Sequence, residues 1–144
     1  MGIIKNTMKN LILFVLILSS INSYSQISIK SGTELILKNV KEVDNGDVIE
    51  GEKVFFILHK DVIIDGKKVL KKGLEAQATV LECKRTKLFG KLKIKFDLLY
   101  LENGDGIKLK STKTGVPSFF DPNGSDIKKG AIISAFVAED FVIN

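Results

Sequence analysis

Apolar and polar residues alternate with a period of two along much of the chain after residue 25. The strictest example is residues 91–98, where every second residue is apolar and all but one of the others is lysine. Successive side chains of a β-strand point to opposite faces, so this pattern predicts a half-buried strand. The residues expected on its inner face are Leu92, Ile94, Phe96 and Leu98.

The alternation changes phase at the end of this strand. Residues 99–101 are apolar without a break, which predicts either a β-bulge or a strand end that is covered on both sides. Asn103–Gly106 then provides a turn, and Ile107–Lys110 resumes the alternation. Two alternating segments around such a turn are typical of a β-hairpin.

Further strands follow from similar patterns. Val62–Leu70 predicts a hairpin that turns at Asp65–Gly66. Val54–Leu58 is a continuous apolar run rich in β-branched and aromatic residues, so it predicts a well-buried strand. Residues 33–43 also fit a helical stripe, although a strand at Glu34–Leu37 is favoured. The remaining predicted strands are Ala76–Leu81, Ala131–Val137 and Phe141–Ile143.

One short pattern occurs twice. Lys72-Gly73 precedes an Ala-x-Val segment at the same spacing as Lys129-Gly130 does. The repetition indicates either the ordinary way in which a β-protein enters its strands or two related strand entries within one barrel. Together these elements predict an all-β fold, with a single antiparallel β-barrel or sandwich over residues 26–144. Removing 25 of 144 residues leaves 119, which is enough for one domain with its own core.

Residues 1–25 have the pattern of a cleavable signal peptide. Lys5 and Lys9 precede the apolar run Leu11–Leu18, and Ser23 and Ser25 are small residues suited to signal peptidase. The expected cut lies before Gln26. The apolar run is much shorter than the roughly 20 residues of a membrane-spanning helix. We therefore expect an exported protein, periplasmic or secreted and able to associate with the cell envelope, with no membrane span after cleavage.

The charge balance argues against nucleic acid as a partner. The whole chain has 22 Lys and Arg against 17 Asp and Glu, and two of the lysines lie in the signal, so residues 26–144 have a net charge of +3. Arg85 is the sole arginine, whereas specific base recognition depends strongly on arginine.

No residue pattern predicts catalysis. A nucleophile–histidine arrangement would depend on His59, which follows a predicted strand and is best interpreted as solvated. Cys83 is the single cysteine and is expected to be a small buried side chain. The alternating oxygen ligands from Asp121 to Ser125 lack the later glycine and glutamate of a calcium-binding loop. We therefore expect no enzyme activity, no cofactor and no metal.

Two groups of residues are candidate surface contacts. The first is a set of lysines, either a solvated face or a stripe that attracts an anionic envelope surface. The second is an apolar loop between residues 111 and 128, either a cover over the core or a tip that faces a partner. The lysines are Lys91, Lys93, Lys95, Lys108 and Lys110, and the loop residues are Val116, Phe119 and Phe120.

The order of glycines and strands resembles a known family. Gly32-Thr33 opens a strand, Gly51-Glu52 leads toward the first hairpin, and Gly90 starts the long strand. This order resembles the C-terminal β-barrel of the TrbI-like scaffold subunit of type IV secretion systems, and more closely small exported bacterial domains of similar pattern. The chain lacks that subunit's long membrane anchor and proline-rich stalk. The resemblance implies a barrel and a scaffolding role without an active site.

The combined expectation is a non-enzymatic interaction or structural module in the cell envelope, whose partner is an envelope protein or an anionic envelope surface. The alternative is a barrel that binds a small ligand in its interior. An enclosed cavity of a few hundred Å³ with convergent polar groups would favour that alternative.

Overall fold

The computed structural model describes residues 26–85, 90–115 and 126–143, and this part of the chain contains strands and no helix. The strands are β1 (Ile27–Ile29), β2 (Glu34–Asn39), β3 (Lys53–Leu58), β4 (Val62–Ile64), β5 (Lys67–Leu70), β6 (Glu75–Arg85), β7 (Gly90–Tyr100), β8 (Gly106–Lys110), β9 (Thr112–Gly115), β10 (Ile132–Val137) and β11 (Phe141–Ile143). The expected signal at residues 1–25 and the apolar residues Val116, Phe119 and Phe120 lie outside the described residues. The all-β prediction is confirmed.

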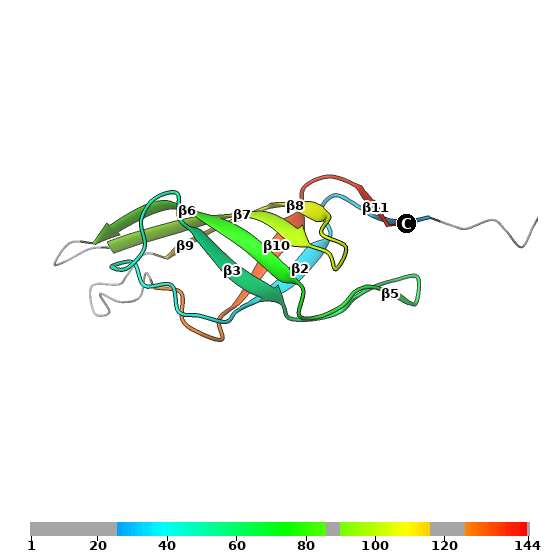
Figure 1. Ribbon diagram of the computed structural model, residues 1–144, viewed down its shortest axis with the longest axis horizontal. Coiled ribbons are helices and arrows are strands. Elements are labelled where there is room, and N and C mark those ends of the chain that lie inside the picture. Colours follow the sequence, from blue (N-terminus) through cyan, green and yellow to red (C-terminus); the bar gives the residue numbers. More distant parts are fainter. Residues whose placement is uncertain (1–25, 86–89, 116–125, 144) are drawn as a thin grey trace, which may run out of the picture.

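Six strands close into an antiparallel barrel (Figure 1). Neighbours in the sheet run β6–β3–β2–β10–β8–β7, and β7 pairs back with β6 to complete the circle. The strand β9 continues β8 along the same edge of β7, since β8 faces residues 98–100 of β7 and β9 faces residues 92–95. The structure therefore decides in favour of a barrel over a sandwich.

The phase change in β7 is a β-bulge at Asp97. Ala78 of β6 faces Phe96 and the adjacent Gln77 faces Leu98, so Asp97 has no partner on β6. The inner face of β7 consequently shifts by one residue after the bulge. Its fully buried side chains are Leu92, Ile94, Phe96 and Leu99. The prediction of a bulge is confirmed, whereas the prediction that Leu98 lies on the inner face is wrong because the extra residue moves it out of phase.

The strand β3 is less buried than its composition predicts. Phe56 and Leu58 are buried, but Phe55 between Val54 and Phe56 is 42% exposed. A strand in a small barrel has one face toward the core and one toward solvent, so a continuous apolar run does not imply burial on both faces. The expectation of a well-buried strand is correct for one face only.

The two Lys-Gly pairs are equivalent strand entries. The N–H of Gly73 donates to the C=O of Leu58 at 2.7 Å, and the N–H of Gly130 donates to the C=O of Asn39 at the same distance. In return, the N–H groups of Leu58 and Asn39 donate to the residue after each glycine, at 2.8 and 2.9 Å. Both glycines have positive φ, 98° and 86°, which an L side chain rarely adopts. The repetition therefore marks two related strand entries within one barrel.

The inside of the barrel is filled by aliphatic side chains and two aromatic rings. Phe56 and Phe96 meet edge-to-face, with ring centroids 5.1 Å apart and planes at 64°. Around them lie fully or nearly fully buried side chains from every barrel strand. They include Leu35, Leu37, Leu58, Ala76, Ala78, Val80, Leu92, Ile94, Leu99, Ile107, Leu109, Ala135 and Val137. The described core is a continuous packed cluster.

Two short ribbons extend the molecule at one end of the barrel. The strands β1 and β11 pair with each other, which places residues 27–29 beside residues 141–143. The strands β4 and β5 form the predicted hairpin, and Asp65 and Gly66 at its turn both have positive φ. These ribbons lie on the side opposite the end of β6 and the start of β7 (Figure 1).

Candidate functional site

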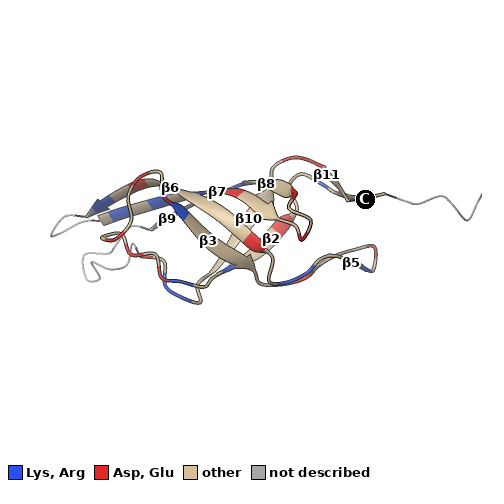
Figure 2. Cartoon of the chain, viewed as in Figure 1, with Lys and Arg blue, Asp and Glu red and all other residues tan. Residues whose placement is uncertain are grey.

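The β6–β7 pair continues beyond the part of the barrel where β3 accompanies it. The register of β3 with β6 ends at Thr79, whereas β6 follows β7 as far as the pair Arg85–Gly90. On the other side of β7, β9 covers residues 92–95. We call residues 81–85 and 90–95 the basic ribbon, and Figure 2 shows its bands of Lys and Arg at one end of the molecule.

The lysines of the basic ribbon share its outer face. Lys84 lies directly opposite Lys91, and Glu82 lies opposite Lys93. Residues directly opposite each other in an antiparallel pair point to the same side, and like charges in such pairs are destabilising. The lysines on this face are Lys84, Lys91, Lys93 and Lys95.

This face concentrates the charge of the protein. Four lysines and the single carboxylate of Glu82 give it a net charge of +3. Residues 26–144 as a whole also have a net charge of +3, because 20 of the 22 basic residues and all 17 acidic residues lie there. With Arg85, the residues of the basic ribbon sum to +4, so the rest of residues 26–144 has a net charge of −1 and the ribbon accounts for the excess of positive charge.

The lysines on this face lower the pKa of the Glu82 carboxyl group. The Lys91 ammonium lies 3.0 Å from the Glu82 carboxylate, and this hydrogen bond holds the pKa of Glu82 below its ordinary value. The charges of Lys91, Lys84 and Lys93 lower the pKa further, against a smaller effect of desolvation. Neither Lys93 nor Lys95 forms an ion pair with a carboxylate among the described residues. The ribbon therefore presents cations that its own acid does not neutralise.

The other two candidate lysines lie elsewhere. The predicted β7–β8 hairpin is present, but β8 accompanies the second half of β7, where Lys108 faces Leu98. The Lys108 ammonium also lies 3.6 Å from the Glu139 carboxylate, and Lys110 faces Phe136 of β10. The structure thus places Lys108 away from the basic ribbon, whereas Lys110 precedes Ser111 and Thr112, which contact Phe96 and Lys95. The apolar loop with Val116, Phe119 and Phe120 is outside the described residues.

Sequence analysis did not predict a polar network on the outer face beside the bulge. The Thr79 hydroxyl donates to the Asp97 carboxylate at 2.5 Å and accepts from the Lys53 ammonium at 2.6 Å. Tyr100 donates to the side-chain oxygen of Gln77 at 2.9 Å. The phase change at residues 99–101 was the sequence signal for the bulge beside this network. Because its members satisfy one another across β3, β6 and β7, the network fixes the register of these strands around Asp97.

The remaining chemistry is sparse in the described part of the chain. His59 follows β3 at the barrel end, and its backbone N–H donates to Ile36 at 2.7 Å. Cys83 is a free thiol that faces Leu92 and packs against the core. Among the described residues, no three His, Cys, Asp or Glu side chains gather where they could hold a metal ion.

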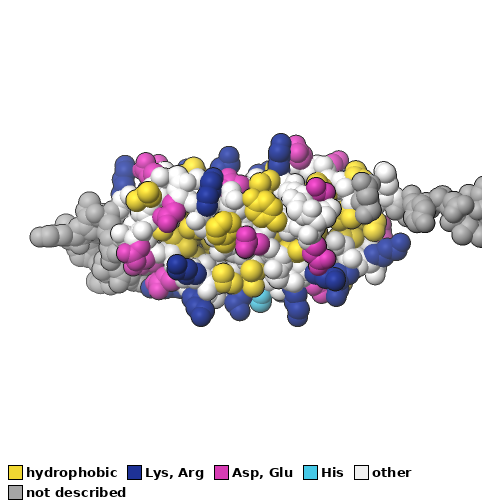
Figure 3. Space-filling view, viewed as in Figure 1, with side chains coloured by type: hydrophobic (Ala, Val, Ile, Leu, Met, Phe, Trp, Pro, Cys, Tyr) yellow, Lys and Arg dark blue, Asp and Glu magenta, His cyan; other side chains and the backbone are white. Residues whose placement is uncertain are grey.

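Exposed apolar side chains do not form one large patch on the visible face. Figure 3 shows hydrophobic groups in small islands that charged and polar side chains separate. Scattered exposed apolar residues are normal for a folded protein. The described residues also include no helix that is long and apolar enough to cross a membrane.

No protein-family model matches the sequence, and no curated protein matches it at a significant level. The geometry of the chain itself is therefore the basis for a functional hypothesis.

Proposed function

We propose that this chain is an exported, non-enzymatic β-barrel that acts as an interaction or structural module of the cell envelope. The observation that carries the proposal is the basic ribbon, whose outer face has a net charge of +3 at one end of the barrel. In this proposal the ribbon docks on an anionic envelope surface, and the closed barrel holds it in a fixed shape.

The arrangement of the lysines supports a role in binding. Lys84 and Lys91 face each other directly, although like charges in this position cost stability. Lys93 and Lys95 add two more cations without a carboxylate partner in the described structure. An anionic surface would offset this repulsion, and clustered cations attract such surfaces and accelerate their encounter.

The packing of the barrel weighs against the alternative of a ligand held inside it. Phe56, Phe96 and the aliphatic side chains around them occupy the interior as one cluster. Two pockets at the described surface are open to solvent and are bordered mainly by strand ends and loops. An internal ligand site needs an enclosed cavity, so a tightly filled interior favours an interaction module.

The proposal includes the expected export signal and the family resemblance. A barrel similar to that of the TrbI-like scaffold subunit would act as a structural part within an envelope assembly. Such a role needs a rigid fold and a docking surface, and it does not need an active site. Export places the basic ribbon where anionic phospholipid or lipopolysaccharide headgroups are its available partners.

Co-sedimentation with anionic vesicles tests the proposal. Residues 26–144 would be mixed with vesicles that contain an anionic phospholipid, across a series of salt concentrations. The variants are Lys93→Glu/Lys95→Glu on the ribbon and Lys60→Glu/Lys129→Glu, which changes two exposed lysines outside the ribbon. Both variants change the net charge equally, so the second controls for a general charge effect.

We expect the wild type to bind at low salt and to lose binding as the salt rises, because exposed charges are screened beyond about 10 Å at 0.1 M salt. The ribbon variant should lose binding while the control keeps it. Equal loss in both variants, or no binding of the wild type to the anionic vesicles at low salt, would contradict the docking role of the ribbon. Circular dichroism of each variant verifies that the barrel is still folded.

A further inference from the structure

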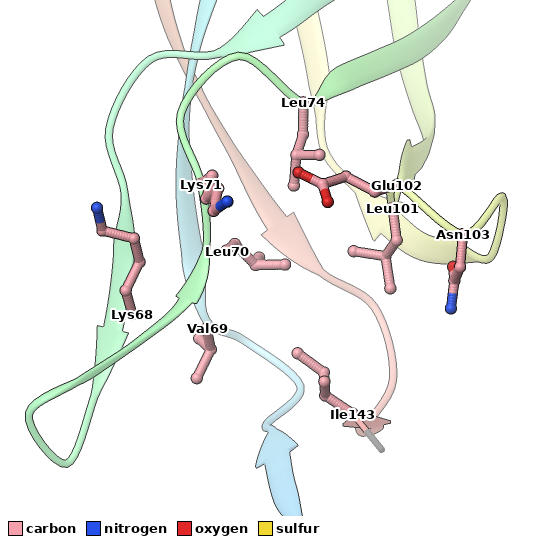
Figure 4. Close-up of a pocket in the computed structure, with 9 residues that line it drawn as sticks. All are labelled: Lys68, Val69, Leu70, Lys71, Leu74, Leu101, Glu102, Asn103 and Ile143. Carbon is pink, nitrogen blue, oxygen red and sulfur yellow. The ribbon is translucent and has the colours of Figure 1, made fainter.

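A pocket of about 260 Å³ opens at the end of the barrel opposite the basic ribbon. It lies between the β4–β5 hairpin, the turn after β7, and β11 (Figure 4). The side chains of Leu70, Leu101 and Ile143 point toward one another across it, and Leu74 closes one side. Its floor is therefore aliphatic, whereas Lys71 and Glu102 lie at its rim.

One wall of this pocket is the edge of a β-strand. Four consecutive residues, Lys68–Lys71, line it, and β5 pairs with β4 alone among the described strands. In a hairpin with a two-residue turn, Ile64 and Lys67 are the hydrogen-bonded pair nearest the turn. The backbone N–H and C=O of the next residue, Lys68, consequently point away from β4. Val69 then forms a β-bulge, because Val62 faces Leu70 whereas Ile63 faces Lys68, so the free edge of β5 offers the N–H and C=O of Lys68. An unpaired edge residue of this kind can pair with another extended chain.

The same wall is basic. Lysines occupy four of the six positions from residue 67 to residue 72, and all four are exposed. Asp61 pairs with Lys68 at 3.3 Å, and the pKa of Asp61 is lowered chiefly by the backbone N–H of Lys72. The other lysines have no carboxylate partner among the described residues. The charge of the wall thus complements an acidic ligand.

We infer that this end of the barrel binds an extended acidic segment of a partner protein, which adds as a strand to the free edge of β5 and places one aliphatic side chain in the pocket. Strand addition uses the backbone for affinity and a pocket for specificity, and both features occur here side by side. At about 260 Å³ the pocket has room for one aliphatic side chain, and the strand edge beside it favours a peptide over a small molecule.

This site goes beyond the proposed function and does not depend on it. The basic ribbon and the β5 edge lie at opposite ends of the barrel (Figure 1), so a membrane surface at one end would leave the other accessible. Vesicle binding can fail while peptide binding succeeds, and the reverse is equally measurable.

A synthetic peptide provides the test. Isotopically labelled residues 26–144 would be titrated with a capped six-residue peptide that alternates glutamate and leucine, and binding would be followed by nuclear magnetic resonance. Two further peptides carry N-methyl groups, one on every glutamate and the other on every leucine. Because the N–H groups of alternate residues point to opposite edges of a strand, each version blocks one edge only.

We expect chemical shift changes at Lys68–Lys71 and Leu101, and binding of one methylated peptide but not the other. Lys68→Pro, which removes the free N–H, should weaken binding at least about tenfold, the effect of losing one good hydrogen bond. Lys68→Ala keeps that N–H and should weaken it by about fivefold at most. Leu101→Ser should weaken binding, whereas Ile63→Ser, on an exposed side chain that does not line the pocket, should not.

Three results would overturn the inference. The first is no binding of the unmodified peptide, and the second is equal binding of both methylated peptides. The third is saturable binding of decanoate that displaces the peptide and is insensitive to Lys68→Pro, because the pocket would then be a site for a small amphiphile. The methylated peptides decide the matter on the unaltered protein even if Lys68→Pro disturbs the hairpin.

Discussion

Replacing Phe96 with alanine tests the packing of the barrel at its central aromatic contact. Phe96 is fully buried, and its ring meets that of Phe56 edge-to-face at 5.1 Å. Truncation of a buried phenylalanine to alanine costs about 3–5 kcal/mol, because the lost transfer free energy and the cavity add. The ring pair contributes about 0.5–1.5 kcal/mol of this. A domain of about 120 residues has a total stability of roughly 6–18 kcal/mol, so the loss is a large fraction of it.

Urea unfolding of residues 26–144, followed by circular dichroism because the chain has no tryptophan, measures this loss. The midpoint should fall while the slope stays constant, which indicates a change in stability alone. The matched control is Lys95→Ala, one residue away on the outer face, and its effect should stay within about 0.5 kcal/mol. A double-mutant cycle with Phe56→Leu should give a coupling of about 1 kcal/mol. Equal costs at residues 95 and 96 would refute the assignment of the two faces of β7.

Two further predictions concern the ribbon and a strand entry. The lowered pKa of Glu82 stabilises the fold above the ordinary value of 4.5, and this contribution is lost as the pH falls through the folded-state pKa. Lys91→Ala should therefore raise the Glu82 pKa in a resonance titration toward 4.5, and an unchanged pKa would exclude Lys91 as the main cause. At Gly73, φ is 98° and a Cβ would meet no atom within 4 Å, so Gly73→Ala should cost about 1–2 kcal/mol through backbone strain alone. Gly73→Asn should cost less, since asparagine tolerates positive φ better, and the opposite order in urea unfolding would show that strain is not the cause.

The described strands were largely predictable because their signals are local. The alternation from Lys91 to Phe96 reveals which face of β7 is buried. The pair Asp65–Gly66 identifies the turn of the β4–β5 hairpin to within a few residues. The bulge at Asp97 also left a local signal, the phase change that follows it. The exposure of Phe55 was not predictable, because an unbroken apolar run carries no information about which side faces solvent.

The candidate sites needed more than local patterns. The lysines of β7 were visible in the sequence, but whether they join Lys84 or Lys108 depends on the register of β7 with β6 and β8. The aliphatic pocket unites Leu70, Leu101 and Ile143, which are far apart in the chain. The residues that line the pocket come from three segments that are well separated in the sequence, so no short stretch of sequence reveals it.

The sequence by itself determined the all-β fold, the hairpins and the inner face of β7 as far as Phe96, since each follows from side-chain periodicity and turn chemistry over a few residues. Only the tertiary structure decided that β6 and β7 close a barrel, that β2 lies beside β10, and that the ends of the barrel carry different surfaces. The pairing of β2 with β10 joins residues about one hundred positions apart. Such pairing is selected by the fit of complete faces around one core, and that fit is a property of the whole chain.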